Sequence, residues 1–167
     1  MQRTALVTGE MAELTGDRDS VGPSLTNPTF AERFAQAWSA PTPERLVDLL
    51  HPNVVLYQPW APTIHGRAAA LREFRRLFAW LPDLHGIVER SSQTGEVVFI
   101  EWQMRFPTGR EMVSVKAIDR FVLQGGLGIE RTVCFDQFNF LAAIIGHPSL
   151  WPGYVRYRFG TQPAWPA

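Results

Sequence analysis

The alternation of apolar and polar side chains over residues 112–123 predicts a long β-strand with one buried face. The apolar face comprises Val113, Val115, Ala117, Asp119, Phe121 and Leu123. The opposite face carries the cations Lys116 and Arg120 and is expected to meet water or a partner subunit. An ionised carboxylate in an apolar layer is costly unless it is paired, hydrogen-bonded or protonated. Asp119 is therefore expected either in an ion pair with an arginine or in a functional site.

Before this strand, apolar residues at helical spacing predict three helices. The first begins near residues 27–30, where Thr29 and Glu32 fit a capping box. A short second helix starts at Thr42 and is expected to stop at residues 51–52, and the third covers residues 67–81. A short strand over residues 53–58 and a loop over residues 60–66 are predicted between the second and third helices.

The remaining strands are predicted over residues 85–91, 96–106 and 129–141, with turns at residues 107–109 and 124–128. Helices segregated from an antiparallel sheet indicate an α+β fold. We expect a cone-shaped, curved antiparallel or mixed sheet wrapped around the three N-terminal helices. Its concave face would enclose an apolar pocket.

Composition narrows the classes of partner and cofactor. The 167 residues carry 16 basic and 16 acidic side chains without a basic stripe, so neither nucleic acid nor an anionic membrane is an expected partner. One cysteine, Cys134, excludes an internal disulfide and a cysteine-based zinc site, and it is predicted to be a small buried apolar residue. No metal-ligand spacing and no phosphate-binding glycine loop is visible, so no cofactor is expected. Six Trp and eleven Phe suit a large core or a pocket for a flat apolar ligand.

The two ends of the chain differ in character. Residues 1–26 are polar and glycine-rich, which predicts a loose arm, or one that folds over a partner subunit. They lack the features of a secretory signal, and no apolar run approaches the roughly 20 residues of a membrane helix, so a cytoplasmic location is expected. Residues 146–167 are too aromatic for disorder and are expected to pack on the domain or across a dimer.

Four local patterns, taken in order over residues 30–141, carry a family resemblance. They are a helix over residues 43–50 running into His-Pro-Asn-Val, Tyr57-Gln58-Pro59 followed by Ile-His-Gly at 64–66, Ala-Ile-Asp-Arg-Phe at 117–121, and Ile-Glu-Arg at 129–131 leading to Phe135-Asp136. Together they resemble the nuclear-transport-factor-2-like superfamily, in its SnoaL-like and ketosteroid-isomerase-like branch. The resemblance implies a SnoaL-like domain over residues 27–145 and a homodimer formed through the convex face of the sheet.

The family's catalytic residues match this sequence in part. Ketosteroid isomerase uses a general base, a tyrosine and a protonated aspartate. In this sequence Gln58 stands at the position of the base, Phe34 at that of the tyrosine and Asp119 at that of the aspartate. The Arg-x-Asp pair of limonene epoxide hydrolase is not matched within residues 101–105, but its second aspartate resembles Asp136. Polyketide cyclases of the SnoaL type use an aspartate with a nearby histidine, which Asp119 or Asp136 and His65 could supply.

The resemblance implies cofactor-free acid/base chemistry on a hydrophobic small molecule, such as a polyketide, terpenoid or steroid-like compound. The alternative is a non-catalytic ligand-binding or accessory protein of the same fold. If Asp119 and Asp136 both point inward, one carboxyl would hold a proton and the pair would provide an acid and a base. The predicted catalytic residues are Asp119, Asp136 and His65. The predicted substrate-binding residues are Gln58, Tyr57, Phe34, Trp102, Met104 and Phe121.

Overall fold

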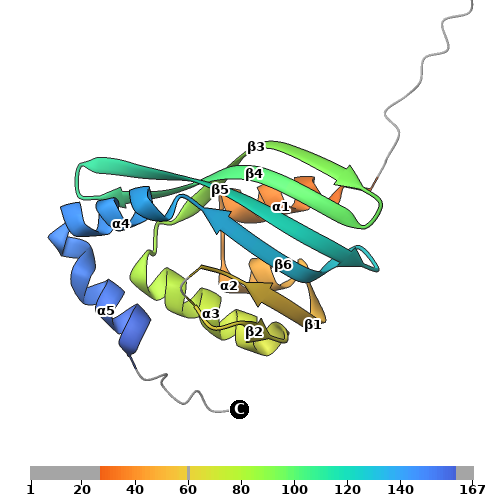
Figure 1. Cartoon of the computed structure of the whole chain (residues 1–167), viewed down its shortest axis with the longest axis horizontal. Coiled ribbons are helices and arrows are strands. Elements are labelled where there is room, and N and C mark those ends of the chain that lie inside the picture. The colour runs from red at the N-terminus through yellow and green to blue at the C-terminus, as the bar shows by residue number, and fades with distance from the viewer. Residues whose placement is uncertain (1–26, 60, 161–167) are drawn as a thin grey trace, which may run out of the picture.

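A single curved sheet organises the chain in the computed structural model, which describes residues 27–59 and 61–160 (Figure 1). Its strands are β1 (Leu50–Tyr57), β2 (Ile64–His65), β3 (His85–Thr94), β4 (Val97–Thr108), β5 (Glu111–Gln124) and β6 (Leu127–Phe135). They lie in the order β2-β1-β6-β5-β4-β3. The pairing of β1 with β6 is parallel and the other pairings are antiparallel, so the expected mixed α+β sheet is confirmed.

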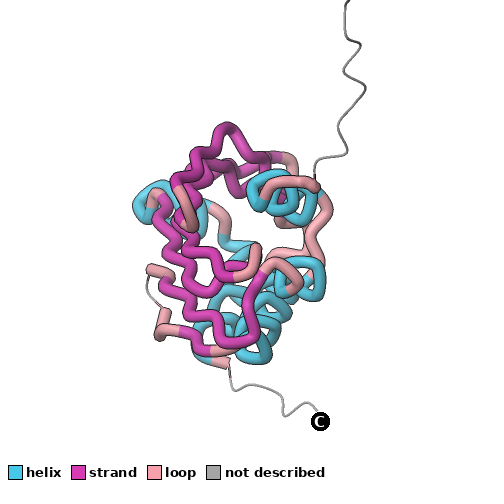
Figure 2. The backbone as a smooth tube through the Cα atoms, turned by 90° about the vertical axis from the view of Figure 1, so that its right-hand side faces the viewer, coloured by secondary structure: helices cyan, strands magenta, loops and turns pink. Residues whose placement is uncertain are grey.

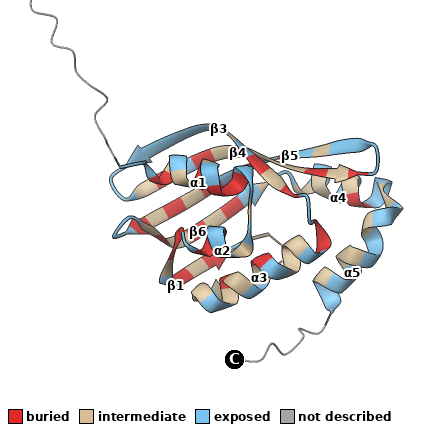
Figure 3. Cartoon of the chain, turned by 180° about the vertical axis from the view of Figure 1, so that it is seen from behind, coloured by how far each residue is buried: buried red, intermediate tan, exposed pale blue. Residues whose placement is uncertain are grey.

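Three helices cover one face of this sheet, as the sequence predicts. They are α1 (Phe30–Ser39), α2 (Pro43–Val47) and α3 (Arg67–Trp80), and in Figure 2 they lie beside the curved strands. The predicted capping box is confirmed, because Thr29 and Glu32 each satisfy a backbone N–H of the other at the start of α1. Seen from behind, the buried residues lie where these helices meet the strands (Figure 3).

The core confirms the predicted alternation of buried and exposed side chains along β4 and β5. Val115, Ala117, Asp119, Phe121 and Leu123 are buried along β5, whereas the residues between them are exposed or partly exposed. Strand β4 buries its own alternate residues, Val98, Ile100, Trp102 and Phe106. The sheet therefore presents one continuous apolar layer to the helices, with the carboxyl of Asp119 inside it.

The end of the last strand differs from the prediction. A strand over residues 129–141 is wrong beyond Phe135, because Asp136 begins helix α4 (Gln137–Gly146). The Asp136 side chain accepts a hydrogen bond from the backbone N–H of Asn139 at 3.0 Å. An aspartate that caps the free N–H groups of a first turn favours a helix start, and this local bond outweighs the apolar run that favoured a strand.

The start of the sheet also differs from the prediction. Helix α2 ends at Val47, and β1 already begins at Leu50, so His51 and Pro52 lie inside the strand. The pairing of β1 with β6 shifts between Leu50 and Val55, and this irregular stretch accommodates the proline, which has no N–H to donate. The predicted loop after β1 contains the two-residue strand β2.

The C-terminal segment is helical as far as the structure describes it. After α4 come the short 3-10 helix η1 (Pro148–Leu150) and helix α5 (Trp151–Phe159), and α5 lies beside α3 (Figure 1). A Cβ atom on Gly153 would lie 2.5 Å from Cδ1 of Trp80, so the missing side chain allows this close approach. The predicted N-terminal arm, residues 1–26, and residues 161–167 lie outside the described part of the chain.

Candidate functional site

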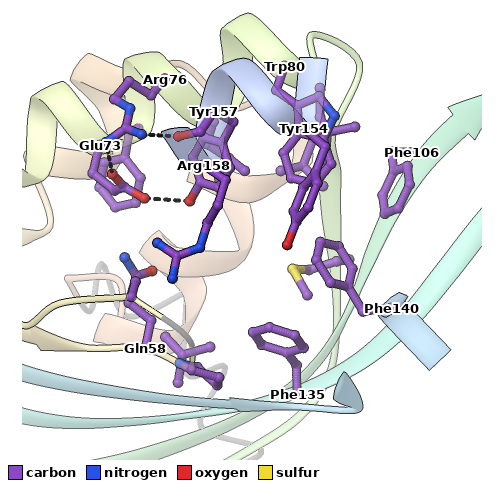
Figure 4. Close-up of a pocket in the computed structure, with 18 of the residues that line it drawn as sticks. Gln58, Glu73, Arg76, Trp80, Phe106, Phe135, Phe140, Tyr154, Tyr157 and Arg158 are labelled. Carbon is purple, nitrogen blue, oxygen red and sulfur yellow. Dashed lines mark hydrogen bonds and ion pairs between the residues drawn. The ribbon is translucent and has the colours of Figure 1, made fainter. Parts of the chain in front are cut away.

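A cavity of about 370 Å³ lies among α3, α5 and the adjoining end of the sheet (Figure 4). Helix α3 provides Glu73, Arg76 and Trp80, while α5 provides Tyr154, Tyr157 and Arg158. The sheet contributes Trp102, Met104 and Phe106 from β4 and Arg131, Val133 and Phe135 from β6. Gln58, which directly follows β1, completes the strand side of the site. The size and mixed lining are those of a small-molecule site.

Aromatic rings form one part of the lining. Trp80 stacks on Tyr157 with ring centroids 5.1 Å apart and contacts Tyr154 at 5.2 Å. Phe140 from α4 meets Phe135 edge to face, with 5.3 Å between the centroids. Planar rings held in this way favour a flat apolar ligand, because such a ligand can stack on their faces.

A hydrogen-bonded cluster of Glu73, Arg76 and Tyr157 forms a polar part of the lining. The phenol of Tyr157 donates to Oε1 of Glu73 at 2.5 Å, and Nη1 of Arg76 lies 3.5 Å from Oε2 of the same carboxylate. Arg76 also donates through Nη2 to the backbone carbonyl of Tyr157. Burial, together with the negative charge of Glu73, raises the pKa of Tyr157, so its phenol keeps its proton at neutral pH. The cluster also attaches α5 to α3.

Two further polar side chains of the cavity have no such partners. Nε2 of Gln58 is buried and has no hydrogen-bond partner within residues 27–59 and 61–160. Arg158 extends from α5 toward Gln58 in Figure 4, and no described carboxylate lies within ion-pair distance of it. Both groups are hydrogen-bond donors at a cavity wall.

The predicted aspartate of the apolar strand face lies behind the cavity. Asp119 is fully buried and accepts hydrogen bonds from Nε of Arg131 at 2.7 Å and from the indole N–H of Trp102 at 3.1 Å. Burial raises the pKa of the Asp119 carboxyl, while Arg131 and Trp102 act in the opposite direction by favouring its ionised form. Of the two alternatives in the sequence, the ion pair with an arginine is the one found. Arg131 lines the cavity, and Asp119 holds its guanidinium in place.

The other two predicted catalytic residues lie away from the cavity. Asp136 is exposed, and its carboxylate caps α4, so it does not form a carboxyl pair with Asp119 inside the cavity. His65, in β2, is exposed and does not line the cavity. The inward carboxyl pair therefore does not form, because the chain turns into a helix at the point where the second aspartate had been expected in a strand.

The predicted substrate-binding residues divide into two groups. Gln58, Trp102 and Met104 line the cavity. Tyr57 is 43% exposed and lies outside the lining. Phe34 and Phe121 meet edge to face in the core between α1 and the sheet, with ring centroids 5.8 Å apart. Cys134 was expected to be buried, but it is exposed because it alternates with buried Val133 on β6.

Sequence reasoning missed the polar residues from α3 and α5. Glu73 and Arg76 look like ordinary charged residues of an amphipathic helix, and Tyr157 and Arg158 belong to a segment with no assigned position. A usable signal was present within α3, because Glu73 shares a helix face with Leu77 and Trp80, four and seven positions further on. Nothing local, however, pairs Glu73 with a tyrosine 84 positions away in sequence.

Two negative findings concern the described residues. Within residues 27–59 and 61–160, no three His, Cys, Asp or Glu side chains gather as a metal-binding group. No helix in the same ranges is both long and apolar enough to cross a membrane.

Solved structures share this fold at low sequence identity. A protein with a ketosteroid-isomerase-like fold from Catenulispora acidiphila, crystallised with trimethylamine, aligns with a TM-score of 0.62 at 18% identity, covering 70% of this chain and 92% of its own. A SnoaL-like polyketide cyclase from Jannaschia reaches 0.58 at 22% identity, covering 66% and 85%. An epoxide hydrolase of M. tuberculosis, similar to limonene epoxide hydrolase, reaches 0.59 at 15% identity, covering 74% and 92%.

The family follows from the sequence itself. A comparison with curated protein sequences finds no match. The SnoaL-like domain, however, matches residues 31–130, which is more than half of the chain and runs from α1 into β6. With the mixed sheet, the three covering helices and the cavity between them, this match identifies the chain as a member of the SnoaL-like domain family.

Proposed function

We propose that this protein binds a hydrophobic small molecule in the cavity and carries out cofactor-free acid/base chemistry on it. The observation that carries the proposal is the position of Glu73, a carboxylate that lines a cavity rich in aromatic rings and bonds to a partly buried phenol. A carboxylate and a phenol side by side are suited to moving a proton and stabilising the resulting oxyanion. Isomerisation, cyclisation, dehydration and hydrolysis of an epoxide or lactone all use such groups.

In this proposal Glu73 is the proton-transfer residue. Its carboxylate would take a proton from an acidic C–H or O–H bond of the substrate. The phenol of Tyr157, whose pKa is raised, would turn its O–H from Glu73 to the oxygen that gains charge. Arg131, held by Asp119, would add fixed N–H donors to the cavity wall.

The experiment is a turnover assay with substrates of these reaction types: a β,γ-unsaturated ketone, an epoxide, a lactone and a β-diketone. Products are followed by liquid chromatography with mass detection. Glu73→Gln should lower turnover roughly 100- to 10,000-fold, the usual contribution of a general acid or base. The matched control is Glu44→Gln, which removes an exposed carboxylate that pairs with Arg75 on the surface. Equal turnover by wild type and Glu73→Gln would contradict the assignment.

A second candidate function is ligand binding without chemistry. It is favoured by the state of the carboxylates, because Asp119 is paired with Arg131, Asp136 caps a helix and both oxygens of Glu73 have protein partners. A carboxylate whose oxygens are already bonded to protein groups has fewer lone pairs free to accept a proton from a substrate. Saturable binding of the compounds above without any product would favour this candidate over the enzyme.

We also propose a homodimer formed through the outer face of the sheet. Ile87, Phe99 and Ile118 are 42%, 46% and 49% exposed on the adjacent strands β3, β4 and β5. Apolar side chains grouped on one sheet face are typical of a surface that a partner covers. The cavity lies on the opposite, helix-covered side, so two copies could associate without closing it.

A further inference from the structure

The cavity lining carries more positively than negatively charged side chains. Its lining includes one carboxylate, Glu73, and three guanidinium groups, those of Arg76, Arg131 and Arg158. Glu73 neutralises Arg76 at 3.5 Å, and Asp119 neutralises Arg131 from behind the lining at 2.5 Å. Arg158 is the cation left over. Its guanidinium contacts the ring of Phe159, 5.9 Å from the centroid, and has no acidic partner among the described residues.

The same region holds a donor without an acceptor. Nε2 of Gln58 is buried, so it can bond neither to bulk water nor to any group of residues 27–59 and 61–160. An unsatisfied buried donor costs free energy relative to a satisfied one. A ligand that supplies an acceptor oxygen would recover this free energy once rotation of the Gln58 amide turns Nε2 toward the cavity. In Figure 4 the guanidinium of Arg158 extends toward the amide of Gln58, whose oxygen is on the side facing Arg158.

We propose that the ligand of this cavity is a flat aromatic or polyunsaturated acid whose carboxylate is bound by Arg158 and Gln58. The inference rests on the proposed function in one respect, that the cavity is a small-molecule site. The guanidinium supplies the positive charge and the amide supplies a second N–H donor, which together match the two oxygens of a carboxylate. The apolar body of the ligand then lies against the rings of Trp80, Phe135 and Phe140.

The alternative ligand charges fit the lining less well. A cationic ligand would need a free carboxylate, and the one in the lining already has Tyr157 and Arg76 as partners. A neutral ligand would leave the charge of Arg158 without a counterion. Since Arg158 is largely exposed, water screens part of this interaction, and we expect a preference of roughly tenfold rather than more.

The test compares two probes that differ in charge and little in shape, 2-naphthoate and 2-naphthamide, by isothermal titration calorimetry at pH 7.5. Wild type should bind the naphthoate roughly tenfold more tightly than the naphthamide. Arg158→Gln and Gln58→Glu should each remove most of this preference, the second because it places a negative charge beside the carboxylate. Circular dichroism melting of each variant confirms that it is folded.

The matched control is Arg156→Gln. Arg156 is an exposed arginine on the same helix that does not line the cavity, so its loss changes the net charge equally and should leave the preference intact. Equal affinity of the two probes for wild type would overturn the inference and leave the proposed ligand site standing. The same preference in Arg158→Gln as in wild type would also overturn it. Binding of neither probe at millimolar concentration would overturn the inference and the proposed function together.

Discussion

Arg131 and Asp119 form a buried ion pair in which Nη2 of the arginine lies 2.5 Å from Oδ2 of the aspartate. The two side chains are 6% and 0% exposed, and they join neighbouring strands β6 and β5. A carboxylate that the sequence predicted for catalysis is therefore bonded to a cation of the cavity lining, and its catalytic role stays a prediction. Removing one member of such a pair leaves the other charged, buried and without a counterion.

We expect Asp119→Asn to destabilise the fold by about 3–5 kcal/mol, because it leaves Arg131 without its counterion. Urea unfolding followed by circular dichroism measures this loss. The double variant Asp119→Leu with Arg131→Met should recover much of the stability, since neither charge then remains. A loss below about 1 kcal/mol in Asp119→Asn would contradict the ion pair as the source of stability.

Asp136 should behave as a helix cap and not as an acid or base. Asp136→Ala removes the bond to the N–H of Asn139 and should cost about 1 kcal/mol in unfolding free energy. Asp136→Ser keeps a capping oxygen and should cost only a few tenths of a kcal/mol. Turnover, once a substrate is known, should be unchanged in Asp136→Ser. A large loss of activity in that folded variant would place Asp136 in the chemistry.

His147 should make stability depend on pH. Its ring contacts the carbonyl of Ala143 at 2.7 Å through Nδ1 and the carboxylate of Glu111 at 3.3 Å through Nε2, and these bonds raise its pKa above the ordinary value. The folded state thus holds the proton more tightly than the unfolded state does. Its contribution is fully present below about pH 6.5, the ordinary pKa of histidine, and is lost as the pH rises through the folded-state pKa.

Thermal unfolding of wild type and His147→Gln at pH 5.5 and pH 9 measures this contribution. The difference in melting temperature between the two proteins should be larger at pH 5.5. It should shrink in high salt, because Glu111 is 77% exposed. Identical differences at the two pH values would contradict a folded-state role for the histidine charge.

Gly153 should be required for the close approach of α5 to Trp80. In Gly153→Ala the new Cβ would lie 2.5 Å from Cδ1 of that indole, so helix or ring must move. Overpacking of this kind costs about 1–3 kcal/mol. We expect faster amide hydrogen exchange in α5 and weaker binding of 2-naphthoate, because α5 forms one wall of the cavity. The matched control is Gly146→Ala at the end of α4, where a Cβ would meet nothing within 4 Å.

The outer sheet face should control the oligomeric state. Ile118→Lys places a charge on the sheet face that also exposes Ile87 and Phe99. If this face forms the proposed homodimer, light scattering after size-exclusion chromatography should show a dimer for wild type and a monomer for the variant. Wild type that is already monomeric would contradict the proposal. Lys116→Ala, on the same face, tests whether any change there has the same effect.

Much of the architecture could be predicted from local patterns. The alternation along β4 and β5 determined which residues enter the core, because side chains point to opposite faces of a strand. The capping box set the start of α1. The prediction failed at Asp136, where an apolar run of helix length follows strand β6 without a break. The spacing of apolar residues in such a run fits a strand as well as a helix, and the capping hydrogen bond of Asp136 favours the helix.

The sequence by itself determined the family, the mixed sheet with its helices and the burial of Asp119. These follow from periodicity and from local bonds between residues close in the chain. Only the tertiary structure decided that Asp119 pairs with Arg131 and that Glu73 meets Tyr157, because each contact joins elements whose separation in space does not follow from their separation in sequence. The cavity, too, was decided only by the tertiary structure. Its walls come from α3, α5 and the strands β4 and β6, and these lie together only after the sheet has curved and the C-terminal helices have closed on it.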